Sequence, residues 1–149
     1  MMQGGTEETT GAMVVGRRTY DLINGWGGNH PSVPNAPVFV VSHDIPKSTP
    51  HGTTPFIFVT EGIKEAVAQA KKAAGKKNVY VVGGANIAQQ CIEEGLLDEM
   101  RLHVAHLLLG GGRKLFGDLS LPIKLKETSV INGPGVTHYR FSLPKKYEL

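Results

Sequence analysis

Residues 78–87 read NVYVVGGANI, an apolar run followed by two glycines and the polar start of another element. A short apolar run that ends at glycine is typical of a buried strand in a parallel sheet. After the glycines, Ile87, Cys91 and Ile92 recur at the spacing of one helix face. Gly95 stands where this helix would end. The segment predicts a strand, a glycine turn and a helix in direct succession.

The same order occurs near the start of the sequence. Residues 12–15 (AMVV) form an apolar run that stops at Gly16. Residues 19–24 then have room for a short helix, with Gly25 as its stop. Strand–turn–helix units of this kind build open α/β sheets that helices cover.

Further strands and one well-marked helix complete the expected architecture. Thr60 is positioned to cap a helix of apolar periodicity that ends at Gly75. The expected strands are residues 12–15, 38–41, 56–59, 78–82, 100–109, 123–131 and 136–143, the last two joined as a hairpin through residues 132–135. This order predicts an α/β fold with a mostly parallel sheet, flanking helices and a C-terminal antiparallel β-hairpin. We expect a polar leader over residues 1–11 and a single domain over residues 12–149.

The composition is that of a globular domain. Of the 149 residues, 40% are hydrophobic and 19% are charged, and 16 basic against 13 acidic residues give a net charge of +3. The basic residues fall in scattered pairs rather than in a stripe, so we expect no nucleic-acid partner. No apolar run approaches the roughly 18–20 residues that span a bilayer, and no signal-peptide pattern is visible. We therefore expect no membrane partner.

Several single residues carry weaker signals. Cys91 is the one cysteine, which excludes an internal disulfide, favours a cytoplasmic location and fits a buried apolar position. His103 and His106 are three residues apart on an expected strand, so they point to opposite faces, and no metal site is expected. Asp21 is expected on a helix surface or as a cap. Trp26 either borders a cleft or covers the core.

The two glycine turns are the strongest candidates for a binding site. In an open α/β sheet, ligands bind outside the carboxyl ends of the strands, where both turns lie. Glycine lets a ligand approach the backbone, and the free N–H groups that begin a helix attract phosphate. Arg17 and Arg18 add guanidinium donors, and Ser42 and His43 end another strand at the same edge.

These turns predict an anionic nucleotide ligand without naming it. Neither turn is the Gly-x-Gly-x-x-Gly fingerprint of dinucleotide-binding folds, and the sequence contains no Gly-Lys-Ser/Thr phosphate loop. The alternative interpretation is that the glycines only allow tight packing of helix on strand.

Several segments resemble the dihydrofolate reductase-fold family, most closely the reductase domain of the bifunctional riboflavin-biosynthesis deaminase–reductase and its small stand-alone relatives. The resemblance covers roughly residues 10–143. It lies in residues 16–21 (GRRTYD), 40–43 (VVSH), 79–87 (VYVVGGANI), 97–103 (LDEMRLH), 109–116 (LGGGRKLF) and 134–138 (PGVTH).

The resemblance implies a homodimeric, NADPH-dependent reductase. Its substrate would be a small heterocycle such as dihydrofolate, or a ribosylaminopyrimidine such as 5-amino-6-(5-phosphoribosylamino)uracil. It also implies that the two turns hold the cofactor phosphates, and that Ser42 and His43 lie near the adenosine 2′-phosphate. The implied cofactor-binding residues are Gly16, Arg17, Arg18, Thr19, Ser42, His43, Gly83, Gly84, Ala85, Asn86 and Ile87. No catalytic residue is assigned, because the proton donor of classical dihydrofolate reductases lies in a part that this sequence does not match.

One part of the family pattern has no counterpart in the sequence. Family members begin with a central strand that carries a Leu-Asp-Gly-like motif and then a helix that lines the substrate pocket, whereas residues 1–11 are polar and glycine-rich. The first central strand would lie between residues 79–82 and 100–109. Without it, two inner strand edges lack a partner, and each buried unpaired backbone group costs about 1–3 kcal/mol.

We expect this gap to be closed in one of three ways: by direct pairing of the two strands, by a segment of another subunit, or by sequence outside this chain. The alternative function is a nucleotide-binding protein without catalysis, or a truncated fragment that acts only when another chain completes it.

Overall fold

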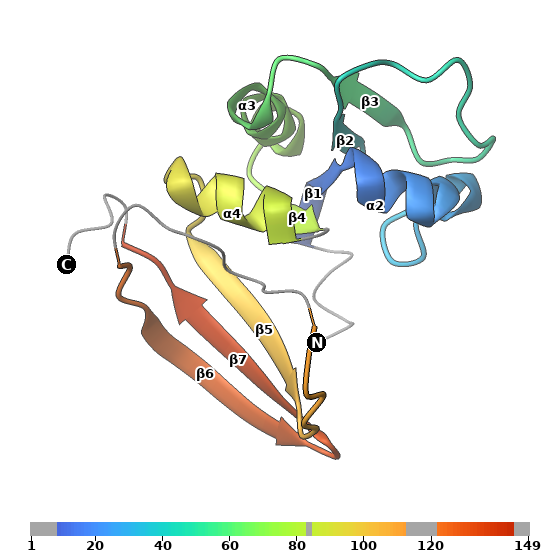
Figure 1. Ribbon diagram of the computed structural model, residues 1–149. Coiled ribbons are helices and arrows are strands. Elements are labelled where there is room, and N and C mark those ends of the chain that lie inside the picture. The colour runs from blue at the N-terminus through green and yellow to red at the C-terminus, as the bar shows by residue number, and fades with distance from the viewer. Residues whose placement is uncertain (1–8, 83–84, 113–121, 145–149) are drawn as a thin grey trace.

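Figure 1 shows the computed structural model, which describes residues 9–82, 85–112 and 122–144. The elements in chain order are β1 (Thr10–Gly16), α2 (Arg17–Leu22), η1 (Asn24–Gly28), β2 (Val38–Val41), β3 (Phe56–Val59), α3 (Ile63–Ala74), β4 (Asn78–Val82), α4 (Ala85–Glu93), β5 (Glu99–Ala105), β6 (Lys126–Gly133) and β7 (Val136–Ser142). A parallel sheet flanked by helices and an antiparallel sheet at the C-terminal end confirm the predicted α/β class.

The parallel sheet has the strand order β3-β2-β1-β4. β1 lies inside this sheet because almost every residue along it can be buried, and Val14 and Val15 are fully enclosed. It begins at Thr10, ahead of the expected start at Ala12.

Alternate residues of this sheet pack into two separate cores. On one face, Val14 packs with Val67 of α3 and Cys91 of α4. On the other face, Val15 packs with Tyr20 of α2. Helices thus cover both faces, and each enclosed valine contributes about 1.5–3 kcal/mol through burial of its side chain.

Glycines end both long helices in left-handed backbone. Gly75, with φ of 63°, donates its N–H to the carbonyl of Lys71 at the end of α3. After α4, Gly95 donates to Ile92, and the next N–H reaches Cys91, which together form a Schellman motif. Within the described ranges, no helix is both long enough and apolar enough to cross a membrane.

The beginning of α3 differs from the prediction. The helix starts at Ile63 with Gly62 as its N-cap, and no side chain caps it. Gly62 has a φ of 103°, a turn that separates Thr60 from the first helical residues. The expectation that Thr60 caps this helix is therefore wrong.

The antiparallel sheet has the order β5-β7-β6, and β6 turns into β7 through Pro134 and Gly135. β5 ends at Ala105 rather than at Leu109, because the apolar run beyond it is exposed and leads to Gly110 with a φ of 75°. β6 runs over Lys126–Gly133 rather than over residues 123–131. Residues 113–116 of the expected family motif lie outside the described residues.

Across the residues described, no backbone ladder joins β4 to β5. Figure 1 shows the antiparallel sheet set apart from the parallel one, with α4 leading into β5. Direct pairing of these strands, one of the three expected ways to close the gap, is therefore wrong. The guanidinium carbon of Arg101 lies 5.4 Å from the ring centroid of Tyr80, a cation–π contact between β5 and β4. Closure by another subunit or by sequence outside the chain stays a prediction.

Candidate cofactor site

The carboxyl ends of the parallel strands form one edge of the sheet. The register pairs Gly16 with Val41, and it pairs Val15 with Val82. The residues that follow β1, β2 and β4 therefore succeed one another along this edge. We call residues 16–19, 42–44 and 85–87 the carboxyl edge.

The first glycine turn touches the helix that follows the second. A β-carbon at Gly16 would lie 2.7 Å from Cγ1 of Ile87, a residue in the first turn of α4 with 7% of its surface exposed. Gly16 therefore permits tight packing of α4 on β1, as the packing interpretation states, and the same contact brings the two turns together. Gly83 and Gly84 lie outside the described residues, and Ala85 begins α4.

Arg17 is the centre of a polar cluster on this edge. Its Nη1 donates to Ser42 Oγ at 2.8 Å and to Asp44 Oδ1 at 2.6 Å, and its Nε donates to Asp21 Oδ1 at 2.8 Å. The hydrogen bond to Asp21, together with the charge of that carboxylate and the contact with Asp44, raises the pKa of the Arg17 guanidinium. The cluster fixes the direction of the arginine fork.

Ser42 is held by the backbone that follows it. Its hydroxyl donates to the carbonyl of Asp44 at 2.5 Å and accepts the N–H of Asp44 at 3.3 Å. This is a local serine turn of the kind that follows strand ends. Because the hydroxyl proton is used there, Ser42 presents a lone pair to Arg17.

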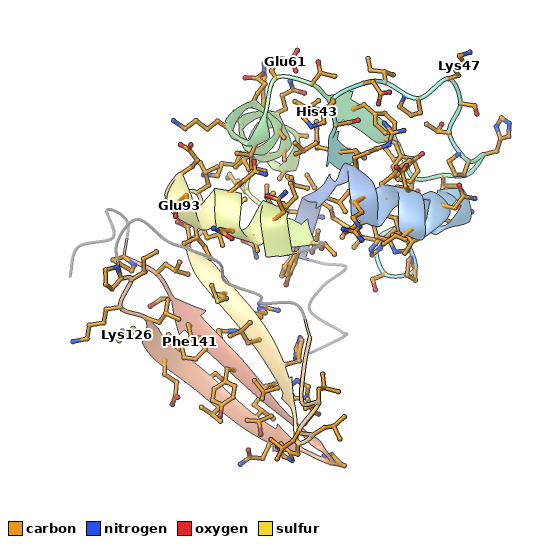
Figure 2. The ribbon with its side chains drawn as sticks, viewed as in Figure 1. His43, Lys47, Glu61, Glu93, Lys126 and Phe141 are labelled. Carbon is orange, nitrogen blue, oxygen red and sulfur yellow. The ribbon has the colours of Figure 1, made fainter. Side chains whose placement is uncertain are left out.

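The remaining predicted residues lie on the same edge with fewer contacts. Arg18 is exposed and Thr19 half-buried on α2. His43, labelled in Figure 2, follows β2 and is exposed. Asn86 is exposed on α4 and accepts a hydrogen bond from Gln90 Nε2 at 2.9 Å.

Sequence reasoning missed Asp44. Its signal was present in the printed sequence, since Ser-x-Asp after a strand favours a side-chain-to-backbone turn. That this turn delivers a carboxylate to Arg17 requires the register of β1 with β2, which the sequence does not show. Asp21 lies exposed on α2 as expected, and it pairs with Arg17 one helical turn earlier.

The edge has donors of the kind that hold phosphate. They are the guanidinium of Arg17, which Ser42 Oγ holds as an acceptor, and the N-terminus of the nine-residue α4 on the same edge. The carboxylate of Asp44 occupies one side of Arg17, so an anionic ligand would compete with Asp44 for that side. Arg17 would be suited to a phosphate group of a dinucleotide only if it exchanged this carboxylate partner for the phosphate.

Other residues singled out in the sequence have structural roles. Trp26 is half-buried and packs against the hydrophobic cluster that contains Tyr20. Its ring centroid lies 4.6 Å from that of His30 in an edge-on arrangement. Cys91 is fully buried, which raises the pKa of its thiol to about 11 and keeps it neutral. Within the described part of the chain, no three histidine, cysteine, aspartate or glutamate side chains gather as metal ligands.

The parallel sheet with an antiparallel sheet after it defines a dihydrofolate reductase-like α/β protein. More closely, the model of the RibD C-terminal domain matches residues 2–139, and the chain belongs to this family.

Solved structures of other proteins share this architecture. The protein of Shewanella sp. PV-4 named "Putative riboflavin biosynthesis protein" superposes with a TM-score of 0.77 and 25% identity, over 95% of this chain and 78% of that one. Dihydrofolate reductase of Enterococcus faecalis, solved with NADP(H), superposes with a TM-score of 0.60 and 16% identity, over 95% of this chain and 80% of that one.

Two curated relatives match part of the sequence. The protein YyaP of Bacillus subtilis (strain 168), described as uncharacterized, is 40% identical over 70 residues, which are 47% of this chain. The matched stretch is 37% of the length of that relative.

Proposed function

We propose that this chain is an NADPH-dependent reductase of the riboflavin-biosynthesis and dihydrofolate reductase-like type. Its substrate class is a small heterocycle or a ribosylaminopyrimidine. NADPH, when bound, supplies the hydride. We further propose that the protein is cytoplasmic and forms a homodimer.

The observation that carries this proposal is the position of Arg17. Its guanidinium lies within 2.8 Å of Ser42 Oγ, at the edge where the contact of Gly16 with Ile87 joins β1 to α4. In a chain of the RibD C-terminal family, this edge is where a nucleotide phosphate would meet an arginine fork, a hydroxyl and a helix N-terminus.

Each predicted residue has a definable task in this proposal. Arg17 and Arg18 would hold phosphate oxygens, and Ser42 and His43 would border the adenosine 2′-phosphate. The backbone of Gly16 and Thr19 and the segment from Gly83 to Ile87 would line the diphosphate.

Asp44 has a specific consequence for the choice of cofactor. A cofactor with a 2′-phosphate brings a dianionic competitor for Arg17, whereas a ribose hydroxyl does not. Displacement of Asp44 by this phosphate would favour NADPH over NADH.

A second candidate function is supported by one observation. β4 and β5 do not pair within the described residues, so no backbone hydrogen-bond ladder joins the two sheets there. A chain that binds nucleotide without turnover, or one that another chain must complete, fits this break. Cofactor binding is common to both candidates, and turnover separates them.

The test is NADPH oxidation, followed by absorbance at the nicotinamide band, with 5-amino-6-(5-phosphoribosylamino)uracil and, separately, with dihydrofolate. Turnover that Arg17→Gln lowers through a raised KM for NADPH supports the reductase. Tight NADPH binding with no turnover of either substrate supports the second candidate. Absence of NADPH binding rejects both.

A further inference from the structure

A hollow of about 270 Å³ lies on the antiparallel sheet, and none of the residues that line it belongs to the carboxyl edge. The register places Arg101 beside Arg140, and in the next row on the same face it places His103 beside His138. Residues two apart on a strand point to the same side, so all four side chains line this hollow. We call these four residues the basic hollow.

The two arginines share one carboxylate. Glu99 Oε1 accepts a hydrogen bond from Arg101 Nε at 3.0 Å, and it forms an ion pair with Arg140 Nε at 3.1 Å. One carboxylate neutralises one of the two guanidinium groups, so the cluster keeps a net positive charge. Both ion pairs use Nε, which leaves the terminal nitrogens of each fork outside the contact with Glu99. The side chains of Arg101 and Arg140 are 28% and 31% exposed, which is open enough for a ligand to reach them.

The two histidines are directly coupled. Nδ1 of His103 lies 2.5 Å from Nδ1 of His138, and the ring centroids are 4.7 Å apart. One Nδ1 must donate and the other must accept. The pair therefore takes up one further proton, at Nε2 of the donor ring, without losing this contact. Burial is the largest cause that lowers the pKa of His103, and the nearby His138 and Arg101 lower it further, so a bound anion would offset this effect.

Among the described residues, the other side chains that line the hollow carry no formal charge. β6 contributes Ser129 and Ile131 to the lining. Glu99 is the acidic group facing the arginines, and Tyr80 of β4 stacks on Arg101. A hydroxyl, two guanidinium forks and a histidine pair that can take a proton form a donor set suited to an oxyanion with several oxygens.

We propose that the basic hollow binds the tetrahedral oxyanion of a phosphate group, held by Arg101 and Arg140 and by the histidine pair once it has taken up a proton. Free phosphate and the phosphate group of a sugar phosphate would be recognised through the same contacts. The site shares no residue with the carboxyl edge, so it does not depend on the proposed cofactor site.

The experiment follows the side-chain nitrogen resonances of His103 and His138 by NMR during titration with inorganic phosphate, ribose 5-phosphate and acetate. Saturable shifts with both phosphates, together with a rise in the apparent pKa of the pair, are expected. Tighter binding of ribose 5-phosphate identifies a sugar phosphate, and equal binding identifies free phosphate. Shifts with acetate of the same affinity, or no saturable shift at millimolar phosphate, overturn the proposal.

Four variants distinguish a loss of phosphate contacts from a folding defect. Arg140→Gln should weaken phosphate binding about tenfold through loss of a charge-assisted contact. Glu99→Gln removes the competing carboxylate and should tighten binding, a gain that misfolding cannot produce. Lys126→Gln removes one positive charge from β6 outside the hollow, and Arg17→Gln removes one from the carboxyl edge. Both variants should leave the phosphate-induced resonance shifts of His103 and His138 unchanged. A loss of these shifts in either variant contradicts the assignment of the site to the basic hollow.

Discussion

The guanidinium of Arg17 lies 2.6 Å from the carboxylate of Asp44, although the two residues belong to segments that follow different strands. The pair sits on the edge where a nucleotide phosphate is proposed to bind. Asp44 is 79% exposed on its side chain, so it can turn away into solvent at little cost.

Asp44→Asn should therefore strengthen binding of NADPH. The substitution removes a competitor for Arg17 and one negative charge near the incoming phosphate, and we expect a gain in affinity of roughly three- to tenfold. Fluorescence titration with NADPH and NADH measures it. Glu61→Asn makes the same change of charge at an exposed position without contact to Arg17. A weaker affinity in Asp44→Asn would show that the carboxylate supports the site.

The contact between Gly16 and Ile87 gives a prediction about stability. Gly16→Ala would push a β-carbon against a buried, β-branched side chain, so we expect a loss of about 1–3 kcal/mol in the free energy of unfolding. Denaturant unfolding of Gly16→Ala, Ile87→Ala and the double variant checks it, because removal of the Ile87 side chain relieves the clash. The losses in the free energy of unfolding for the two single variants, added together, should exceed the loss for the double variant.

Gly111→Ala is the matched control for this series. An added β-carbon there meets nothing within 4 Å, and the backbone is not left-handed. Stability should change by less than about 0.5 kcal/mol. Additive costs for Gly16 and Ile87 would mean that the two residues do not touch.

His30 predicts how stability depends on pH. Its Nδ1 accepts the N–H groups of Ser32 and Val33, and burial lowers its pKa below the ordinary value. The unfolded chain then binds the proton more tightly than the folded one. Stability should fall as pH drops through about 6.5, the ordinary value for histidine, toward the lower pKa of the folded state.

Chemical unfolding at a series of pH values tests this. His30→Asn keeps an acceptor near the same position and removes the titrating group, so it should flatten this part of the pH dependence. His51→Asn, a change at an exposed histidine, should leave it in place. An unaltered slope in His30→Asn would assign the pH dependence to other groups.

The break between the two sheets predicts a pattern of hydrogen exchange. β1 has partners on both sides, whereas β4 pairs with β1 alone within the described residues. Alternate amides of β4 should exchange faster than those of β1, because they point away from the ladder. Uniform protection along β4 in the purified protein would reveal a further partner strand, and concentration dependence would identify a second subunit as its source.

The local elements followed from the sequence because their signals were local. Apolar runs that stop at glycine mark β1 and β4, and Gly75 and Gly95 mark the helix ends. The limit of β5 was not predictable in this way. The apolar stretch continues through Leu109, but a strand continues only where a neighbour supplies hydrogen bonds, and β7 pairs with β5 only as far as Ala105.

The candidate site also has one part that the sequence predicts and another that depends on contacts between distant segments. Glycine, arginine and serine at strand ends indicated an anion site, and the parallel register brings Gly16 and Ser42 to one edge. The pairing of Arg17 with Asp44 and the basic hollow depend on contacts between distant segments. Arg101 and Arg140 are 39 residues apart in the sequence and meet only through antiparallel pairing of β5 with β7.

Titration of the purified chain with NADPH tests the central claim most directly. Saturable binding is predicted, tighter for NADPH than for NADH. Arg17→Gln should weaken it by at least about tenfold, while Lys47→Gln, an equal change of charge on an exposed loop, should leave it unchanged. An affinity that is the same with and without the Arg17 guanidinium would contradict the account.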